Sequence, residues 1–129
     1  MKKLLYITLA ISLLAFGAEA RAAKLKKVLI LDFINIEKKS AFQYLESTIT
    51  GSVQKMLKAK FAFKETAKSK WKGVAEDNFL YRGDYYTRSV AMNIGLLAKQ
   101  DVVIAGGYRI VDKRGGSQII THVYIIDIS

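Results

Sequence analysis

The sequence predicts one α/β (α+β) domain, in which a mixed β-sheet of about four strands carries two to three packed helices. A chain of 129 residues has room for a single domain. The unbroken apolar run at 28–34 has the length of a strand that is covered on both faces. Near the other end, two runs rich in Val, Ile and Tyr flank a glycine-bearing turn, a pattern typical of an antiparallel hairpin.

Residues 1–20 have the layout of a secretory signal peptide, which leaves the domain at 24–129. A basic start is followed by the apolar run 4–16 and then by small residues up to Ala20. Cleavage after Ala22 fits the same small-x-small pattern. The apolar run is shorter than the roughly 20 residues needed to cross a bilayer, so cleavage is favoured over an uncleaved membrane anchor.

The chain contains no cysteine, so it offers no acceptor for a lipid anchor and no disulfide. About 107 residues remain after cleavage, enough for core burial alone to stabilise the fold. We therefore expect an exported protein of the periplasm or cell envelope that is neither lipid-anchored nor integral to the membrane.

The elements are expected in the order β-α-β-α-α-β-β, beginning with a central strand at 28–34. Ser40 is a candidate N-cap for a helix over 41–58, with Gln43 completing a capping box. Glu46 is expected on the solvent side of this helix. The buried face is expected to carry the residues at helical spacing, Phe42, Leu45, Ile49, Val53, Met56 and Leu57.

A short strand at 60–64 comes next, followed by a helix for which Thr66 is the candidate cap. One side of that helix carries Ala67, Trp71, Val74 and Ala75. After a loop at 77–83, Asp84 is the candidate N-cap of a third helix that ends near Lys99. Gly95 costs this helix about 1 kcal/mol relative to alanine, so we expect it to serve close packing on the sheet.

The closing hairpin spans 101–129, and Gly115 and Gly116 are expected to supply positive φ in its turn. The pair at 106–107 is expected to allow a bulge or a close backbone approach. Neither pair has the sequence context of a nucleotide-binding loop, so no cofactor is expected. The last strand is apolar from 119 to 128, and an open edge there would be a template for strand addition, including self-association.

Three segments carry a family resemblance. They are the aliphatic run leading to Phe-Ile-Asn at 28–35, the Tyr-Leu-Glu helix start at 44–46, and the helix-to-strand passage at 91–108, with Ile-Gly and then Ala-Lys-Gln-Asp-Val-Val-Ile-Ala-Gly. The chain resembles the small α/β domain shared by the N-terminal domain of TolB, CsgG, FlgO and LpoB. The resemblance implies this fold and a non-enzymatic role in the cell envelope. The family commonly adds a further strand, and whether another chain supplies it here is left open.

The sequence carries no recognisable catalytic or metal-binding constellation. Its one histidine, His122, lies in the last predicted strand, whereas a metal site needs three or four ligands. No Gly-x-Ser-x-Gly elbow marks a nucleophile. We expect no catalytic, cofactor or metal residues and no small-molecule substrate. The remote alternative is an enzyme that uses Asp32 at the end of the first strand, where open α/β sheets place ligands.

The chain is strongly basic, with a net charge of +10 that becomes +9 (19 basic and 10 acidic residues) on cleavage after Ala20. A candidate polyanion-binding segment comprises Lys55, Lys58, Lys60, Lys64, Lys68, Lys70 and Lys72. An ordinary solvated lysine face explains this segment equally well. A candidate partner-binding region comprises Trp71, Tyr81, Arg82, Tyr85 and Arg88. For Trp71, and for Tyr86 in the same stretch, packing in the core is the alternative.

The sequence therefore favours an exported, non-enzymatic binding or assembly module of the cell envelope that acts through protein–protein contacts. The alternative is a basic surface-binding protein whose segment 55–72 engages anionic lipid or glycan, with nucleic acid less plausible for an exported chain. The two hypotheses differ in the salt dependence that they predict, because exposed charges are screened by salt.

Overall fold

The computed structural model describes residues 25–128 of the chain. The predicted signal peptide at 1–20 and both candidate cleavage sites lie outside the described residues. No helix within the described range is both long enough and apolar enough to cross a membrane.

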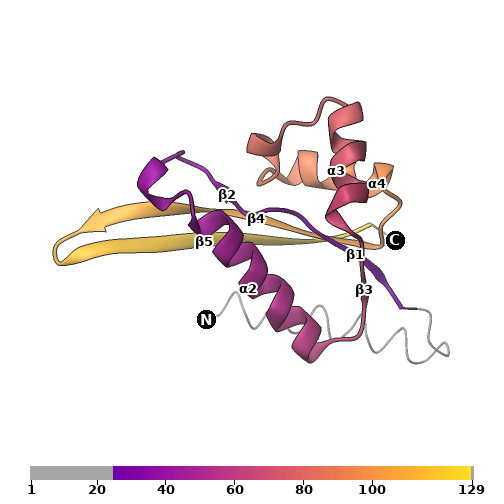
Figure 1. The fold of residues 1–129 in the computed structure, drawn as a ribbon, viewed down its shortest axis with the longest axis horizontal. Coiled ribbons are helices and arrows are strands. Elements are labelled where there is room, and N and C mark those ends of the chain that lie inside the picture. Colours follow the sequence, from indigo (N-terminus) through magenta and orange to yellow (C-terminus); the bar gives the residue numbers. More distant parts are fainter. Residues whose placement is uncertain (1–24, 129) are drawn as a thin grey trace.

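A five-stranded mixed sheet forms the centre of the domain (Figure 1). The strands β1 (Lys27–Ile30) and β2 (Ile34–Asn35) pair in parallel with β4 (Val102–Lys113), and β3 (Lys64–Glu65) pairs in parallel with β1. The last strand, β5 (Gly116–Asp127), runs antiparallel along the whole of β4. The predicted α/β domain with a mixed sheet and a closing hairpin is confirmed, with five strands in place of about four.

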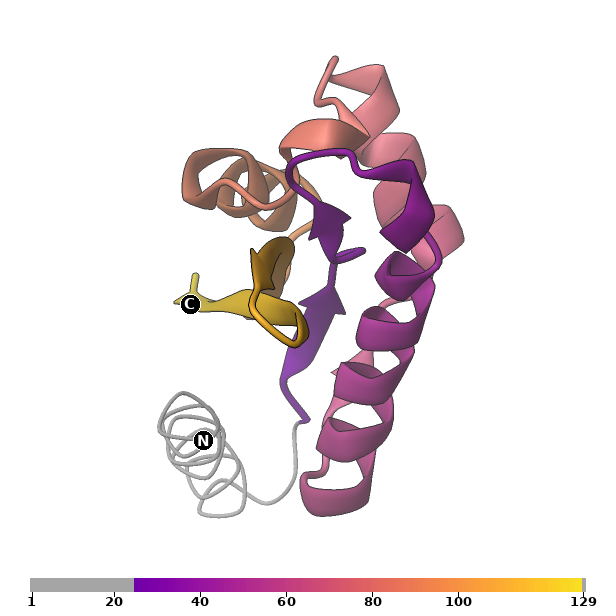
Figure 2. The same cartoon turned by 90° about the vertical axis from the view of Figure 1, so that its left-hand side faces the viewer.

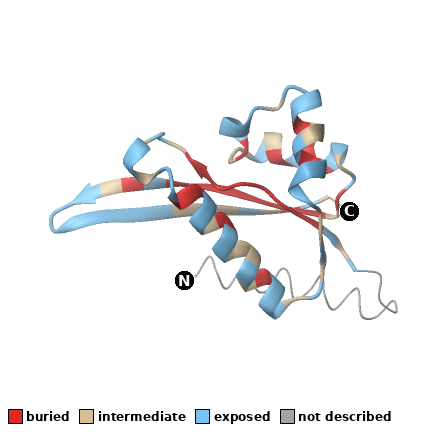
Figure 3. Cartoon of the chain, viewed as in Figure 1, coloured by how far each residue is buried: buried red, intermediate tan, exposed pale blue. Residues whose placement is uncertain are grey.

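Helices cover both faces of the sheet (Figure 2). α2 (Leu45–Lys60) and α4 (Arg88–Leu97) lie on opposite faces. α3 (Lys68–Asp77) shares the core cluster of α4 through Trp71 and Ala75. This cover ends part-way along β4, so the outer half of the hairpin extends beyond the helices and is largely exposed (Figures 1 and 3).

The two faces of β1 explain why the first apolar run shows no alternation. Successive residues of a strand point to opposite faces, so Val28 and Ile30 pack with Leu57 of α2, while Leu29 packs with Ile94 on the α4 side. A strand with helices on both sides needs apolar residues at every position. The prediction of a central strand that is covered on both faces is therefore confirmed.

A β-bulge interrupts this first strand. Ile30 pairs with Ile104 and Ile34 with Gly107, so three residues on one strand face two on β4. The amide of Phe33 turns away from β4 and donates to Thr50 Oγ1 of α2 at 2.8 Å. The residue in the middle of the bulge is Asp32. Bulges re-aim side chains and are common beside functional sites.

The predicted start of the first helix is wrong. Residues Ser40–Phe42 form a 3-10 turn, and α2 begins at Leu45 without a side-chain cap. No capping box forms, because the Gln43 side chain bonds to Asn35 and Glu46 instead. The start of α2 is therefore held by hydrogen bonds among Asn35, Gln43 and Glu46 and not by a capping side chain.

Two further boundaries differ from the prediction. The second strand lies at 64–65, because α2 continues through Lys60 and occupies the start of the predicted range. Asp84 does not cap the third helix: it ends the 3-10 turn Arg82–Asp84, and α4 begins only at Arg88. Thr66 also does not cap α3, because its hydroxyl donates to Gln100 Oε1 at 2.6 Å.

Glycines stand in the hairpin turn and in α4 where a side chain would not fit the structure. In the hairpin turn, Gly115 and Gly116 have φ of 90° and 144°. In α4, a Cβ atom on Gly95 would meet the side chains of Val103 and Ile128. The expected close packing of this helix on the sheet is therefore confirmed.

Candidate functional site: an aromatic cavity beside a buried ion-pair network

Asp32, in the bulge, begins a network of charged side chains. Its side chain is 11% exposed, and its Oδ2 atom lies 2.9 Å from Lys68 Nζ of α3 and 3.2 Å from Arg82 Nε. The position follows from the chain order, because Asp32 lies just past the carboxyl end of the parallel strand β1. That edge of an α/β sheet is where ligands and functional side chains collect.

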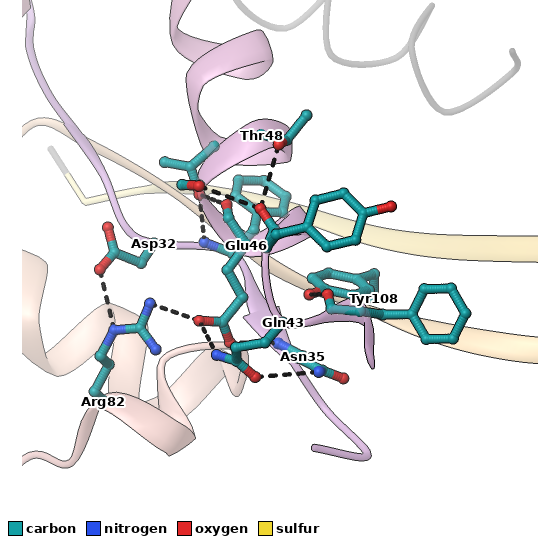
Figure 4. A network of polar contacts seen from close by, with 12 residues as sticks. Asp32, Asn35, Gln43, Glu46, Thr48, Arg82 and Tyr108 are labelled. Atoms are coloured by element: carbon teal, nitrogen blue, oxygen red, sulfur yellow. Dashed lines mark hydrogen bonds and ion pairs between the residues drawn. The ribbon is translucent and has the colours of Figure 1, made fainter. Parts of the chain in front are cut away.

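Glu46 continues the network and is buried, contrary to the prediction that it faces solvent. Its Oε1 atom lies 2.8 Å from Arg82 Nη2 and accepts a hydrogen bond from Gln43 Nε2 at 2.7 Å. Its Oε2 atom accepts a hydrogen bond from the backbone N–H of Asn35 at 2.8 Å. Figure 4 shows the continuous path from Asp32 through Arg82, Glu46 and Gln43 to Asn35. Three donors to one carboxylate compensate for its lost hydration.

Arg82 joins the two carboxylates. Burial acts to lower its pKa, but the hydrogen bond and charge of Glu46, and then the charge and hydrogen bond of Asp32, together raise that pKa above its ordinary value. The guanidinium therefore stays charged and ties the bulge and α2 to the loop before α4. In this arrangement each carboxylate has a cationic partner, and the network fixes the positions of the elements that carry it.

A cavity of about 300 Å³ opens beside this network. The rings of Trp71 and Tyr85 form its buried wall; they are 2% and 3% exposed and meet edge to face at 5.6 Å between centroids. Phe79 and Tyr81 lie at its opening, 78% and 70% exposed. The remaining lining residues are Asp32, Lys68, Lys72, Glu76, Leu80 and Arg82.

A second cavity, of about 260 Å³, shares three lining residues with the first: Asp32, Lys68 and Arg82. Its other lining residues come from the start of α2 and from the turn before it, and they are Gln43, Glu46, Ser47 and Thr50. The ion pairs of Asp32 thus contribute to both cavities. The larger, aromatic cavity has the mixed apolar and charged lining that is typical of recognition sites.

The aromatic cavity brings together most of the candidate partner-binding residues. Four of the five candidate partner-binding residues line it, namely Trp71, Tyr81, Arg82 and Tyr85, whereas Arg88 begins α4 and is not among the lining residues. Trp71 and Tyr85 are core residues as well as wall residues, so the alternative of core packing holds for Trp71. The exposed aromatic surface belongs to Tyr81 and to Phe79, which the sequence analysis did not select.

The candidate lysines are all exposed, but they do not form one isolated patch. They run from the last turns of α2 through β3 to α3. Lys68 and Lys72 line the aromatic cavity, and Lys58 Nζ lies 2.8 Å from Glu65 Oε1. The basic segment therefore adjoins the aromatic region.

Two polar residues of the network could have been found in the sequence. At about 100° per residue, Glu46 and Thr50 fall on the same stripe of α2 as Val53 and Leu57. A buried carboxylate on an apolar stripe requires a cationic partner, and Arg82 is that partner. Nothing in the spacing of the two residues, 36 positions apart in the chain, indicated this pair.

The wall tyrosine gives the stability of the fold a pH dependence. Burial, followed by the charges of Asp32 and Glu76, raises the pKa of Tyr85, while Arg82 opposes the shift. An acid with a raised folded-state pKa contributes stability that is complete below its unfolded pKa of about 10 and is lost as the pH rises through its folded pKa. Tyr85→Phe should therefore lose less stability than the wild type above about pH 10.

Urea unfolding at pH 8 and at a pH above the unfolded value would measure this difference. Tyr81→Phe is the matched control, because its ring is 70% exposed. Equal losses of stability in the wild type and in Tyr85→Phe would show that the buried phenol does not titrate as described.

Comparisons with known proteins add one structural likeness. No protein-family model matches the chain, and no curated protein sequence matches it. A solved structure does match: the C-terminal domain of LpoB from Salmonella enterica. The TM-score is 0.49 at 14% identity, over 92% of this chain and 96% of that chain. LpoB is one of the proteins whose shared domain the sequence resembles.

Proposed function

We propose that this chain is an exported, non-enzymatic binding module of the cell envelope, and that it contacts a partner protein at the aromatic cavity. The observation that supports this most is the convergence on one cavity of four candidate partner-binding residues, among them the exposed ring of Tyr81, together with the exposed ring of Phe79. Export and the envelope location rest on the signal-peptide pattern and on the family resemblance of the sequence.

The cavity has the make-up of a protein-binding hot spot. Aromatic and arginine side chains around a pocket are the residues that dominate binding free energies in protein interfaces. Phe79 and Tyr81 would pack around an apolar anchor side chain of the partner, whose end would contact the rings of Trp71 and Tyr85. Lys68 pairs with Asp32 and Lys72 with Glu76, but the lining carries three basic and two acidic side chains, and this excess of positive charge favours an acidic residue beside that anchor.

Removal of both exposed rings is expected to abolish partner capture without affecting the fold. A hot-spot side chain contributes about 2 kcal/mol or more, and two such losses together correspond to a several-hundredfold weakening, so we expect Phe79→Ser combined with Tyr81→Ser to remove detectable capture. The measurement is crosslinking capture from the native envelope with the processed chain as bait, followed by quantification of the captured protein. Thermal unfolding of the same variant checks that the fold is intact.

Tyr44→Ser is the matched control, because Tyr44 is 65% exposed and lies outside both cavities. The control should capture the partner as the wild type does. Equal capture by the double variant and by the control would remove the cavity from the interface and leave the proposal without its site.

The exposure of all seven lysines keeps polyanion binding as a second candidate. Retention on heparin or anionic vesicles should then collapse between low and moderate salt, because exposed charges are screened. Exchange of Lys55, Lys60, Lys64 and Lys70 for glutamine should abolish retention, whereas the aromatic double variant should retain it. Salt-resistant capture of one protein, lost only with the aromatic rings, would instead favour the leading proposal.

A further inference from the structure

The second surface of interest is the free edge of β5. This strand makes twelve consecutive pairs with β4, and no other strand within residues 25–128 pairs with it. In an antiparallel ladder every second residue directs its N–H and C=O groups away from its partner strand. The outer edge of β5 therefore presents a long row of backbone groups that another strand can bind.

This edge lacks the features that normally keep sheet edges apart. Proteins protect such edges with charged side chains, proline, bulges or very short strands. From Ser117 to Ile126 there is no Lys, Arg, Asp, Glu or Pro, and the register with β4 contains no bulge. Three large apolar side chains on the strand are exposed, namely Ile119 (48%), Ile120 (41%) and Tyr124 (40%).

The charges at the two ends of β5 point to a second copy of this chain as the partner. At the turn end of the hairpin Lys113 and Arg114 outnumber Asp112, which leaves one net positive charge, whereas β5 ends at Asp127. An antiparallel copy places each basic turn beside the acidic end of the other copy, twice over by twofold symmetry. A parallel copy would place like charges together. The middle of β5 carries no Lys, Arg, Asp or Glu, so it pairs best with a strand edge that also carries none, and β5 of a second copy is such an edge.

We propose that two copies join antiparallel through β5 about a twofold axis at His122, so that their sheets form one continuous sheet. This register places Ile120 opposite Tyr124 of the second copy and Ile119 opposite its Ile125. Directly opposed aromatic and β-branched side chains stabilise antiparallel pairs. An axis at Thr121 would place Tyr124 opposite the polar Gln118 and would lose the aromatic pair. A register shifted by one residue would turn the side chains of the second copy to the other face of the sheet.

Sedimentation of the natively processed protein over a wide concentration range tests the association. The wild type should form a dimer, and Ile119→Lys should raise the dissociation constant at least tenfold by placing a charge on the edge. Ser52→Lys on an exposed position of α2 adds the same charge elsewhere and should leave the dimer unchanged. A monomer at every concentration, or a dimer that Ile119→Lys leaves intact, would overturn the proposal.

The register can be tested by disulfide trapping, because the chain contains no cysteine of its own. A mixture of the Ile120→Cys and Tyr124→Cys chains should form a mixed disulfide, since directly opposed Cβ atoms lie about 4.5–5.5 Å apart. Each variant alone should form little, because its two thiols would lie several residues apart across the axis. Equal crosslinking in all three samples would overturn the register.

This inference does not rest on the proposed function, because Ile119 lies outside the cavity. Recovery of the processed chain in a complex with a different protein that Ile119→Lys releases would assign the edge to another occupant and would overturn the second copy. Capture that depends on Phe79 and Tyr81 would be unaffected by that result.

Discussion

Replacement of Trp71 by alanine is expected to lower the free energy of unfolding by about 3–5 kcal/mol. The indole is 2% exposed and packs with Tyr85, Ile94 and Val103 in the core cluster on the α4 side. Its removal leaves a hole that the neighbouring side chains fill only in part. Urea unfolding at neutral pH, with Tyr81→Ala as the exposed control, measures the effect.

The control should change the free energy of unfolding by no more than about 0.5 kcal/mol, as surface substitutions usually do. A Trp71→Ala variant as stable as the wild type would contradict the core position of the indole. A Trp71 variant that no longer binds a partner could therefore have lost either its fold or its interface, and binding alone does not distinguish the two. Tyr81 and Phe79 are therefore the residues with which to map the surface.

The second large effect is expected for Gly106→Ala. A Cβ atom at this position would meet the carbonyl oxygen of His122 in β5 and would lie 2.6 Å from Cε2 of Phe33. Neither neighbour can move freely, because one is backbone in the hairpin and the other is a fully buried ring. We expect a loss of about 3 kcal/mol or more in the free energy of unfolding, at the upper end of the range for overpacked sites.

Gly51→Ala is the matched control for this variant. A Cβ atom on Gly51, within α2, has no heavy atom within 4 Å, so alanine there should gain about 0.5–1 kcal/mol through its helix propensity. Opposite signs for the two substitutions in the same unfolding experiment are the expected result. A Gly106→Ala variant that unfolds at the wild-type urea concentration would show that the strands separate at this point without cost.

The fold could be predicted from the sequence because its longest patterns are unambiguous. The apolar run beginning at Val28 requires cover on both faces, and the paired β-branched runs around Gly115 specify a hairpin. Both features depend on local composition. The element order and the helices on both faces follow from them.

The errors at element boundaries arose where tertiary contacts compete with local signals. Gln43 and Asp84 have the residue types of helix starts, yet Gln43 bonds to Glu46 and Asp84 ends a 3-10 turn. The same turn presents Arg82 to both carboxylates. A local capping preference contributes about 1 kcal/mol, which a buried charged network can outweigh.

The candidate site was predictable in its residue types but not in its geometry. The enrichment of aromatic and basic residues between Trp71 and Arg88 indicated a contact region. Which rings face outward depends on the packing of α3 against α4, and this packing buries Trp71 and Tyr85 while it exposes Phe79 and Tyr81. The role of Asp32 depends on a bulge that exists only because β1 and β2 pair with the same strand.

We propose the aromatic cavity as the surface at which this chain contacts a partner protein in the cell envelope. Site-specific photocrosslinking in living cells tests this proposal directly, with the photoreactive residue at position 81 and, for comparison, at position 44, where the side chain is 65% exposed against 70% at position 81. We expect one discrete crosslinked product in the envelope fraction from position 81 and none from position 44. The absence of a crosslinked product from both positions, or the same product from both, would contradict the placement of the interface at the aromatic cavity.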